Sequence, residues 1–246
     1  MSKGTCLLSY VPMRSEPRSG AEMVSSLIFG ESYLLTSEDN GFVKITTDFD
    51  NYEGWISKNT VSEYIPFDKI NDELFVIAKS GNEKIFIPCG ANMPSNNEFK
   101  KDEIIFKIEP SVRTNHHLPI KLRLTKTAQM FLNTPYIWGG RSFMGIDCSG
   151  FVQIVFKANG INLLRDTNQQ ILQGTEVLFE NRNVGDLVFF SKPNSDKVTH
   201  AGLLYNSDTV IHASGFVKLQ ALEPEGLINE NCETEYKLMA IKRLID

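Results

Sequence analysis

The sequence predicts an α+β protein in which all-β units precede a domain of helices and sheet. Short β-type runs separated by turn residues fill roughly the first 110 positions, and no helical period appears among them. Helical periodicity begins only after Pro119, and strand-like runs return towards the carboxyl terminus. Strands of about four to six residues at this spacing are typical of small barrels, and helices followed by sheet indicate an α+β domain.

The composition excludes several classes of function. With 246 residues, 41% of them hydrophobic, the chain can bury the core of one large domain or of two to three small ones. The net charge is −5 and the 25 lysines and arginines form no run, so we expect neither nucleic-acid nor anionic-membrane binding. No window approaches the roughly 18 apolar residues of a membrane span, and Pro12 ends an N-terminal apolar run too short for a signal peptide. We therefore expect a soluble cytoplasmic protein, or a periplasmic one whose export signal has been removed.

The first half of the chain divides at two polar segments. We expect strands at residues 5–11, 24–27, 32–36, 42–47, 54–56, 75–78, 84–88 and 103–108. Residues 66–73, which are polar and carry a proline, are interpreted as the seam between two small barrels, and residues 109–119 as a linker. The boundaries predict three units: residues 1–66, 67–112 and 113–246.

The second half begins with helices. One is predicted over residues 122–132, before Pro135, and a second follows Asp147, which can cap it. Apolar residues repeat at i, i+4, i+7 and i+8 until Gly160, namely Cys148, Val152, Val155 and Phe156. A third helix is predicted over 167–173, and strands over 186–191, 199–205, 209–213 and 237–243.

Cys148 occupies the first turn of the second predicted helix, in the stretch "GIDCSG". Unsatisfied backbone N–H groups and the positive end of the helix dipole favour a thiolate there, as a nucleophile requires. The alternative is a small packing residue in the apolar stripe, because free cysteine is among the most buried residue types. The position alone leaves both interpretations open.

Two of the four histidines, His200 and His212, lie in adjacent predicted strands. If the hairpin centres on Asn206, they stand directly opposite each other, with Cβ atoms about 4.5–5.5 Å apart. One imidazole then orients the other, and a thiol nucleophile needs such an oriented base. The pair therefore favours a catalytic role for Cys148.

A zinc site is the competing interpretation, because two histidines and a cysteine can bind zinc. The acid and hydroxyl beside Cys148 would then have no role, and the helix dipole would oppose a cation. The four cysteines lie far apart without a C-x-x-C pair, so a zinc knuckle is not expected. His116 and His117 lie together in the linker and are expected to be solvated.

Five ordered motifs resemble the NlpC family of papain-like cysteine peptidases. They are "TPYIWGGRSFMGIDCSGFVQ" (134–153), "LLRDTNQQ" (163–170), "GDLVFF" (185–190), "THAGLLY" (199–205) and "VIHASG" (210–215). In the N-terminal half, "MRSEPRSGAEMVSSLIFGESY" and "YEGWIS" resemble the bacterial SH3-like domain that precedes the catalytic domain in this family's recycling branch. The resemblance implies a papain-like domain over 113–246, an SH3-like domain over 1–66 and a second, divergent one over 67–112.

The resemblance implies a γ-D-glutamyl-L-diamino acid endopeptidase similar to dipeptidyl-peptidase VI. Such enzymes cut stem peptides released from peptidoglycan, between D-glutamate and the diamino acid, and require a free N-terminal L-alanine. The expected partner is thus a peptide, L-Ala-γ-D-Glu-diamino acid, bound by a monomer without metal or organic cofactor. Which diamino acid is accepted stays open.

The catalytic roles follow by the same resemblance. Cys148 is implied as the nucleophile, His200 as the base and His212 as the residue that orients it. Tyr136 corresponds to the tyrosine that lies beside the thiolate and helps with the oxyanion; otherwise it is an aromatic residue in a loop.

Further residues are implied at the substrate. The candidates in the cleft are Asp147, Ser149, Arg165, Asp166 and Thr167. Asp147 can serve as a helix cap as well, and Thr167 stands where the family often has serine. For the alanine ammonium we expect Glu22 and Tyr52, with Glu16 as the substitute acid, because an ammonium needs an acid and a hydrogen-bonding or aromatic partner.

Two other functions remain as alternatives. The same thiol and histidines can serve an amidase or acyltransferase that acts on another amide. Alternatively, the SH3-like units belong to a cell-wall-binding or peptide-binding module with an inactive catalytic domain.

Overall fold

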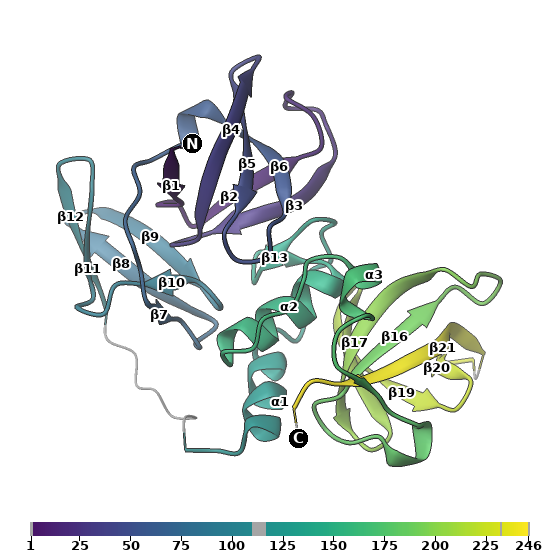
Figure 1. The fold of residues 1–246 in the computed structure, drawn as a ribbon. Coiled ribbons are helices and arrows are strands. Elements are labelled where there is room, and N and C mark those ends of the chain that lie inside the picture. Colours follow the sequence, from purple (N-terminus) through teal and green to yellow (C-terminus); the bar gives the residue numbers. More distant parts are fainter. Residues whose placement is uncertain (1, 110–116, 232, 246) are drawn as a thin grey trace.

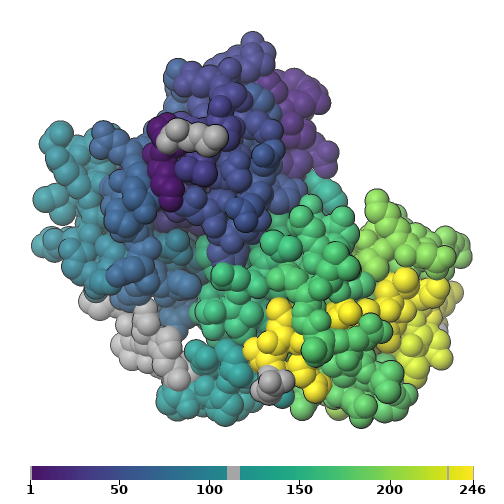
Figure 2. All heavy atoms as spheres, in the orientation of Figure 1, coloured from purple at the N-terminus to yellow at the C-terminus, as the bar shows by residue number. Residues whose placement is uncertain are grey.

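The protein is built mostly from strands, with three α-helices in the described residues. The structure is a computed structural model that describes residues 2–109, 117–231 and 233–245 (Figure 1). In the space-filling view, an N-terminal lobe and a C-terminal lobe sit on a shared central segment, and the outline is indented between them (Figure 2). None of the helices among the described residues is long and apolar enough to cross a bilayer.

The N-terminal lobe is a six-stranded antiparallel sheet. Its order is β1-β4-β5-β6-β2-β3. The strands are β1 (Lys3–Thr5), β2 (Tyr10–Arg14), β3 (Met23–Ile28), β4 (Ser32–Asp39), β5 (Phe42–Thr47) and β6 (Glu53–Ser57), followed by a 3₁₀ turn at Lys58–Thr60. Alternate residues of these strands fill a core of their own, including Val11, Met13, Val43, Ile45 and Ile56.

The next unit is a smaller β-structure beside the first. Strand β7 (Lys69–Ile70) pairs with β10 (Asn92–Met93), and a four-stranded sheet has the order β11-β12-β8-β9. Its strands are β8 (Phe75–Ser80), β9 (Glu83–Pro88), β11 (Glu98–Lys101) and β12 (Ile104–Ile108). The buried side chains of this unit belong to the same apolar cluster as those of the central helix, so the two pack as one core.

The rest of the chain combines helices with a seven-stranded sheet. It contains α1 (Ile120–Met130), β13 (Arg141–Ser142), β14 (Gly145–Ile146), α2 (Cys148–Ala158), α3 (Thr167–Gln170), β15 (Thr175–Glu176), a 3₁₀ turn (Phe179–Asn181), β16 (Leu187–Ser191), β17 (Val198–Asn206), β18 (Thr209–Ser214), β19 (Phe216–Glu223), β20 (Gly226–Ile228) and β21 (Thr234–Arg243). The order is β15-β21-β16-β17-β18-β19-β20, and β20 also pairs with β21. That last pairing closes β16 to β21 into a ring.

Helix α2 lies at the centre of the molecule, and every one of its residues is buried (Figure 1). Asp147 caps it as predicted, because its carboxylate accepts a hydrogen bond from the backbone N–H of Gly150. A Cβ at Gly150 would lie 2.3 Å from the carbonyl oxygen of Gly140, so only glycine fits this close approach. The helix ends at Ala158, before Gly160 at φ +80°.

A buried ion cluster joins the N-terminal sheet to α2. Glu31, in the β3–β4 turn, accepts hydrogen bonds from the Arg141 guanidinium at 2.9 Å and from Lys157 Nζ at 2.6 Å. All three side chains are 2% exposed. Burial alone would raise the pKa of Glu31, but the two cations lower it to about 2. These buried ion pairs therefore connect the N-terminal lobe to the central helix.

Several predicted elements differ from the structure. Predicted strand 5–11 is interrupted: residues 6–9 form no strand and separate β1 from β2, and the Cys6 thiol donates to the Leu8 carbonyl oxygen. The third helix ends at Gln170, three residues early. Strands β7, β10, β11, β13, β14, β15, β19 and β20 were not predicted, and most of them are too short for an alternation to show. Most of the predicted linker, with His116, lies outside the described residues, and His117 is exposed.

Candidate active site

A cavity of about 710 Å³ opens between the N-terminal sheet, the start of α2, α3 and the β16–β17 connection. Its volume is in the range of small-molecule binding sites. Ten of the eleven predicted site residues line it: Glu22, Tyr52, Tyr136, Asp147, Cys148, Ser149, Arg165, Asp166, Thr167 and His200. The eleventh, His212, lies directly behind His200. The structure thus brings together residues that are up to 190 positions apart (22 to 212).

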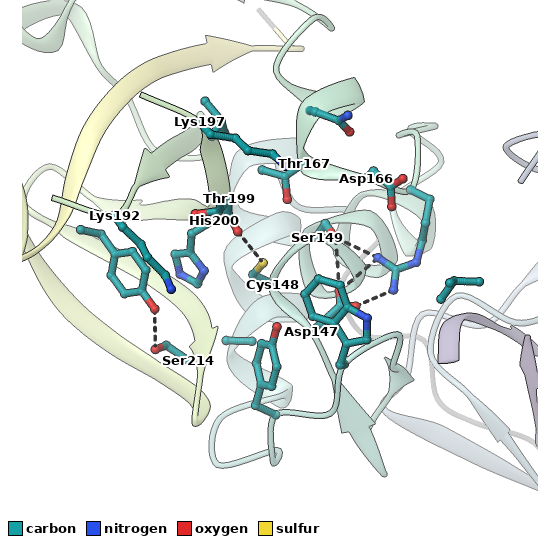
Figure 3. A pocket seen from close by; sticks show the side chains of 18 of the residues that line it. Asp147, Cys148, Ser149, Asp166, Thr167, Lys192, Lys197, Thr199, His200 and Ser214 are labelled. Carbon is teal, nitrogen blue, oxygen red and sulfur yellow. Dashed lines mark hydrogen bonds and ion pairs between the residues drawn. The ribbon is translucent and has the colours of Figure 1, made fainter. Parts of the chain in front are cut away.

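Cys148 lies at the amino end of α2 with its sulfur at the cavity. Its side chain is 5% exposed, and the thiol points at the Thr199 carbonyl oxygen, 3.9 Å away (Figure 3). Burial, with a further contribution from Asp147, raises the pKa of the thiol to about 11. The predicted ready ionisation of this sulfur is therefore opposed in the free protein, because burial raises the pKa more than Arg165 and the neighbouring backbone N–H groups lower it.

The two histidines meet, but not in the predicted register. His212 pairs with Gly202 rather than with His200, because the hairpin turns at Ser207 and Asp208 instead of being centred on Asn206, with a register shift between Leu204 and Asn206. His200 is therefore the diagonal neighbour of His212 on the same face of the sheet. The ring nitrogens His200 Nε2 and His212 Nδ1 are 2.7 Å apart, so the expected contact forms through this diagonal arrangement.

The environment keeps both imidazoles neutral near pH 7. Burial lowers the pKa of His200 well below its usual value, and His212 and Lys218 lower it further. Burial and Lys218 lower the pKa of His212 to about 4, although Gln220 opposes the shift. The Tyr236 ring stacks on the His200 ring with centroids 4.4 Å apart and an interplanar angle of 17°. The pKa directions therefore favour a neutral thiol and a neutral imidazole in the free protein.

The hydrogen bonds continue beyond the second histidine. His212 Nε2 is 2.9 Å from Gln220 Oε1. The Gln220 amide donates to the Ile228 carbonyl at 3.0 Å and to Glu235 Oε2 at 2.8 Å. The sequence reading missed Gln220 and Glu235, because β19 and β20 were not predicted and the contacts depend on strand pairing.

Asp147 and Arg165 form a buried pair at the floor of the cavity. Arg165 Nη2 lies 2.6 Å from Asp147 Oδ2, and Arg165 Nη1 lies 2.8 Å from Ser149 Oγ (Figure 3). The remaining Arg165 nitrogen, Nε, donates to Ser25 Oγ on β3 at 3.0 Å. The Asp147 oxygens also accept from backbone N–H groups, including Gly139 at 2.8 Å. The pair therefore fixes the start of α2 against the N-terminal sheet.

The N-terminal sheet contributes one wall of the cavity. Glu22 Oε1 accepts a hydrogen bond from Trp138 Nε1 at 2.8 Å, and the Tyr52 hydroxyl donates to Asp166 Oδ1 at 3.3 Å. Burial, with Asp166, raises the pKa of Tyr52 to about 12, and burial also raises the pKa of Asp166. Glu16, the substitute acid, is exposed, pairs with an arginine and does not line the cavity.

Tyr136 and Thr167 complete the predicted set. Burial, with the neighbouring Cys148, raises the pKa of Tyr136, so its hydroxyl stays protonated and available as a donor. Its backbone N–H donates to the Gly215 carbonyl at 2.9 Å, which ties the loop to the β18–β19 turn. Thr167 is the first residue of α3 and lies at the cavity wall (Figure 3).

Eleven lining residues were not predicted, among them Trp138, Lys192, Lys197 and Tyr236. Trp138 lies inside the quoted motif, but an exposed indole has no distinguishing pattern in the sequence. The two lysines belong to the β16–β17 connection and are exposed. They lie on one side of Cys148, and Asp166 lies on the other (Figure 3). In the described parts of the chain, no group of three or more His, Cys, Asp or Glu residues is placed to hold a metal ion.

Comparison with known proteins identifies relatives of both parts of the chain. Residues 133–234 match the NlpC/P60 family, and residues 13–61 match the bacterial dipeptidyl-peptidase Sh3 domain. Dipeptidyl-peptidase 6 of Lysinibacillus sphaericus is 34% identical over 237 residues, 81% of this chain and 83% of the relative. Gamma-D-glutamyl-L-lysine dipeptidyl-peptidase of Bacillus subtilis (strain 168) is 28% identical over 212 residues, 77% of this chain and 71% of the relative.

A solved structure has the same fold. A crystal structure of an NlpC/P60 family protein from Bacillus cereus ATCC 10987 superposes with a TM-score of 0.78, covering 98% of this chain and 99% of that one at 18% identity. Fold and relatives together define a cysteine peptidase that acts on peptidoglycan-related material. The chain belongs to the NlpC/P60 family, with a bacterial dipeptidyl-peptidase SH3 domain at its amino end.

Proposed function

We propose that this protein hydrolyses the bond between γ-D-glutamate and the L-diamino acid of peptidoglycan stem peptides that carry a free N-terminal L-alanine, in cell-wall recycling. One observation carries the proposal: Cys148 and His200 share a cavity whose wall includes Glu22 and Tyr52 of the N-terminal sheet. A wall of this kind limits how much peptide fits ahead of the scissile bond. The relatives named as dipeptidyl-peptidases support the same release of a dipeptide.

The proposal includes a division of the chain into domains. Residues 1–66 form an SH3-like domain, 67–112 a second, divergent one, and 113–246 the papain-like catalytic domain. The separate six-stranded sheet with its own core supports the first boundary. The second unit has its own four-stranded sheet but shares a core with α2, so it acts as a support for the catalytic domain.

In the proposed mechanism, Cys148 Sγ attacks the γ-glutamyl carbonyl carbon. Because the thiol is neutral in the free protein, its proton passes to His200 as the C–S bond forms. The backbone N–H groups of the first turn of α2 have no acceptor within the helix, and with the Tyr136 hydroxyl they hold the oxyanion.

The second half of the reaction regenerates the thiol. His200 gives its proton to the departing amine as the C–N bond breaks, which leaves a thioester on Cys148. Water then attacks the thioester with His200 as the base. The acyl part leaves as L-Ala-D-Glu, and the proton returns to sulfur. No step in this sequence requires an oxidant or a reductant.

The charges that line the cavity favour one direction of binding for the peptide. Glu22 lies at the wall formed by the N-terminal sheet and suits the alanine ammonium. Lys192 and Lys197 lie on the other side of Cys148 from Asp166, where the departing part of the peptide and its carboxylates would lie (Figure 3). The ammonium thus faces an acid and the carboxylates face lysines.

A pair of peptides tests the proposal. L-Ala-γ-D-Glu-diaminopimelate and its N-acetylated form are incubated with the protein, and products are identified by mass spectrometry. We expect L-Ala-D-Glu from the first peptide only, because acetylation removes the ammonium that Glu22 would bind. Equal cleavage of both peptides would favour the general amidase, and absence of cleavage with tight binding would favour the binding module.

A further inference from the structure

The hydrogen bonds of Gln220 leave a single orientation for its amide group. Its nitrogen lies 2.8 Å from Glu235 Oε2 and 3.0 Å from the Ile228 carbonyl oxygen, and its oxygen faces His212 Nε2. Both of the first two partners are acceptors, so a flipped amide would place oxygen against oxygen at both positions. Gln220 Oε1 must therefore accept, and the proton of the His212 contact must lie on His212 Nε2.

The proton on His212 Nε2 determines the direction of the next hydrogen bond, between His212 and His200. A neutral imidazole carries one N–H, so His212 Nδ1 is an acceptor when Nε2 is protonated. His200 Nε2 lies 2.7 Å from His212 Nδ1 and must donate to it. His200, also neutral, then keeps an unprotonated Nδ1, which is the only ring nitrogen left to accept a proton from Cys148.

We propose that Gln220 is a positioning residue that, acting through His212, holds the proton of His200 on Nε2 and leaves Nδ1 free as the base. The inference rests on the proposed function, in which Cys148 and His200 are the reacting pair. Gln220 touches neither the substrate nor Cys148; its effect is on the tautomer.

Glu235 and Lys218 affect the hydrogen-bond relay that runs from Gln220 through His212 to His200. Glu235 holds the Gln220 amide and lies 3.9 Å from Lys218 Nζ. Lys218 is a cause of the lowered pKa of both histidines, and Glu235 opposes it at His212. Burial and Lys218 outweigh Glu235 and Gln220, so both rings stay uncharged, as a single tautomer requires.

Gln220→Leu tests the inference, because leucine has a similar size and no hydrogen-bonding group. Ring ¹⁵N–¹H NMR reads the tautomers without any substrate, and kcat and KM are measured with the tripeptide. We expect both rings as Nε2–H in the wild type, mixed tautomers in Gln220→Leu, and a kcat lower by about 10- to 100-fold at a KM changed less than about twofold. Gln129→Leu, on an exposed face of α1, is the matched control and should change neither.

Gln220→Met keeps the test decisive if Gln220→Leu is unstable, because methionine likewise has no amide group to fix the His212 proton. We expect mixed tautomers and a lower kcat in this variant too. Unchanged tautomers and kcat in whichever of the two variants is folded would overturn the relay. If instead the wild type shows the Nε2–H tautomers but cuts no tripeptide, the relay stands and the proposed function fails.

Discussion

Cys148 is both a packed residue and a residue at a reaction cavity. The sequence left these two interpretations open, and the structure shows that they are compatible: the side chain is 5% exposed, yet the sulfur faces the cavity. The residue type and its place after Asp147 were predictable because the helix cap is a local pattern. The raised pKa was not, because it depends on how much of the fold covers the thiol.

The pH dependence of Cys148 alkylation follows from its pKa. With the pKa raised to about 11, little thiolate is present at pH 7, and the thiolate fraction grows about tenfold per pH unit below the pKa. The rate of reaction with iodoacetamide, mapped to the Cys148 peptide by mass spectrometry, should rise steadily from pH 7 to pH 10. A rate that is already constant below pH 7 would show a preformed thiolate–imidazolium pair and contradict the neutral-pair mechanism.

Glu22 and Glu16 provide a matched pair of acids in the loop between β2 and β3. Glu22 lines the cavity, whereas Glu16 is exposed outside it. Loss of a charge-assisted contact to the alanine ammonium corresponds to about tenfold or more in binding. Glu22→Gln should raise KM for the free-amine tripeptide by about tenfold with kcat nearly unchanged, and Glu16→Gln should leave both values as they are. Equal effects of the two substitutions on steady-state kinetics would remove Glu22 from the site.

At the scale of elements, local patterns were predicted and pairing was not. Helix α2 was predicted from one capping residue and one apolar stripe, and both patterns lie within about a dozen residues. The β17–β18 hairpin was predicted, but its turn lies at Ser207 and Asp208 rather than at Asn206, and a register shift follows after Leu204. Gln220 was missed for the same reason, since its role depends on β19 lying beside β18.

The first turn of α2 should tolerate no added methyl group. A Cβ at Gly150 would lie 2.3 Å from the Gly140 carbonyl oxygen, which is backbone and cannot move aside easily. Gly150→Ala should destabilise the protein by roughly 1–3 kcal/mol, as overpacking does, and lower the turnover of the tripeptide. Urea denaturation measures the free energy of unfolding. Gly20→Ala, where the nearest atom is an arginine side-chain nitrogen 3.6 Å away, is the control and should behave like the wild type.

At the scale of the molecule, the N-terminal sheet is part of the active site rather than an appendage. It supplies Glu22 and Tyr52 to the cavity, and Ser25 to the buried Arg165. The sequence indicated an SH3-like unit by resemblance, and Glu22 and Tyr52 were predicted to contact the alanine ammonium. It did not predict the cluster around Glu31, because charges far apart in the chain carry no pattern that pairs them.

Removal of one charge from the buried cluster should loosen the whole assembly. Glu31→Gln leaves Arg141 and Lys157 without their carboxylate, so we expect a loss of about 3–5 kcal/mol in the free energy of unfolding. The pKa of Glu31 is lower in the folded protein, at about 2, than its ordinary value of 4.5. The difference in the free energy of unfolding between wild type and variant should therefore be largest above pH 4.5 and should decrease as the pH falls towards 2.

The surface pair of Glu38 and Lys58 gives the control for this experiment. Both side chains are more than half exposed, so Glu38→Gln should change the unfolding midpoint little at any pH. If Glu31→Gln unfolds at the same denaturant concentration as the wild type, the cluster does not hold the lobes together.

The central claim is that the Cys148 sulfur attacks the γ-glutamyl carbonyl. Release of L-Ala-D-Glu from L-Ala-γ-D-Glu-diaminopimelate, followed by mass spectrometry for the wild type and for Cys148→Ala side by side, tests it most directly. We predict that the wild type forms the dipeptide and that Cys148→Ala, with unchanged circular dichroism, forms none above the enzyme-free background. Substantial dipeptide from the folded Cys148→Ala variant would contradict the claim.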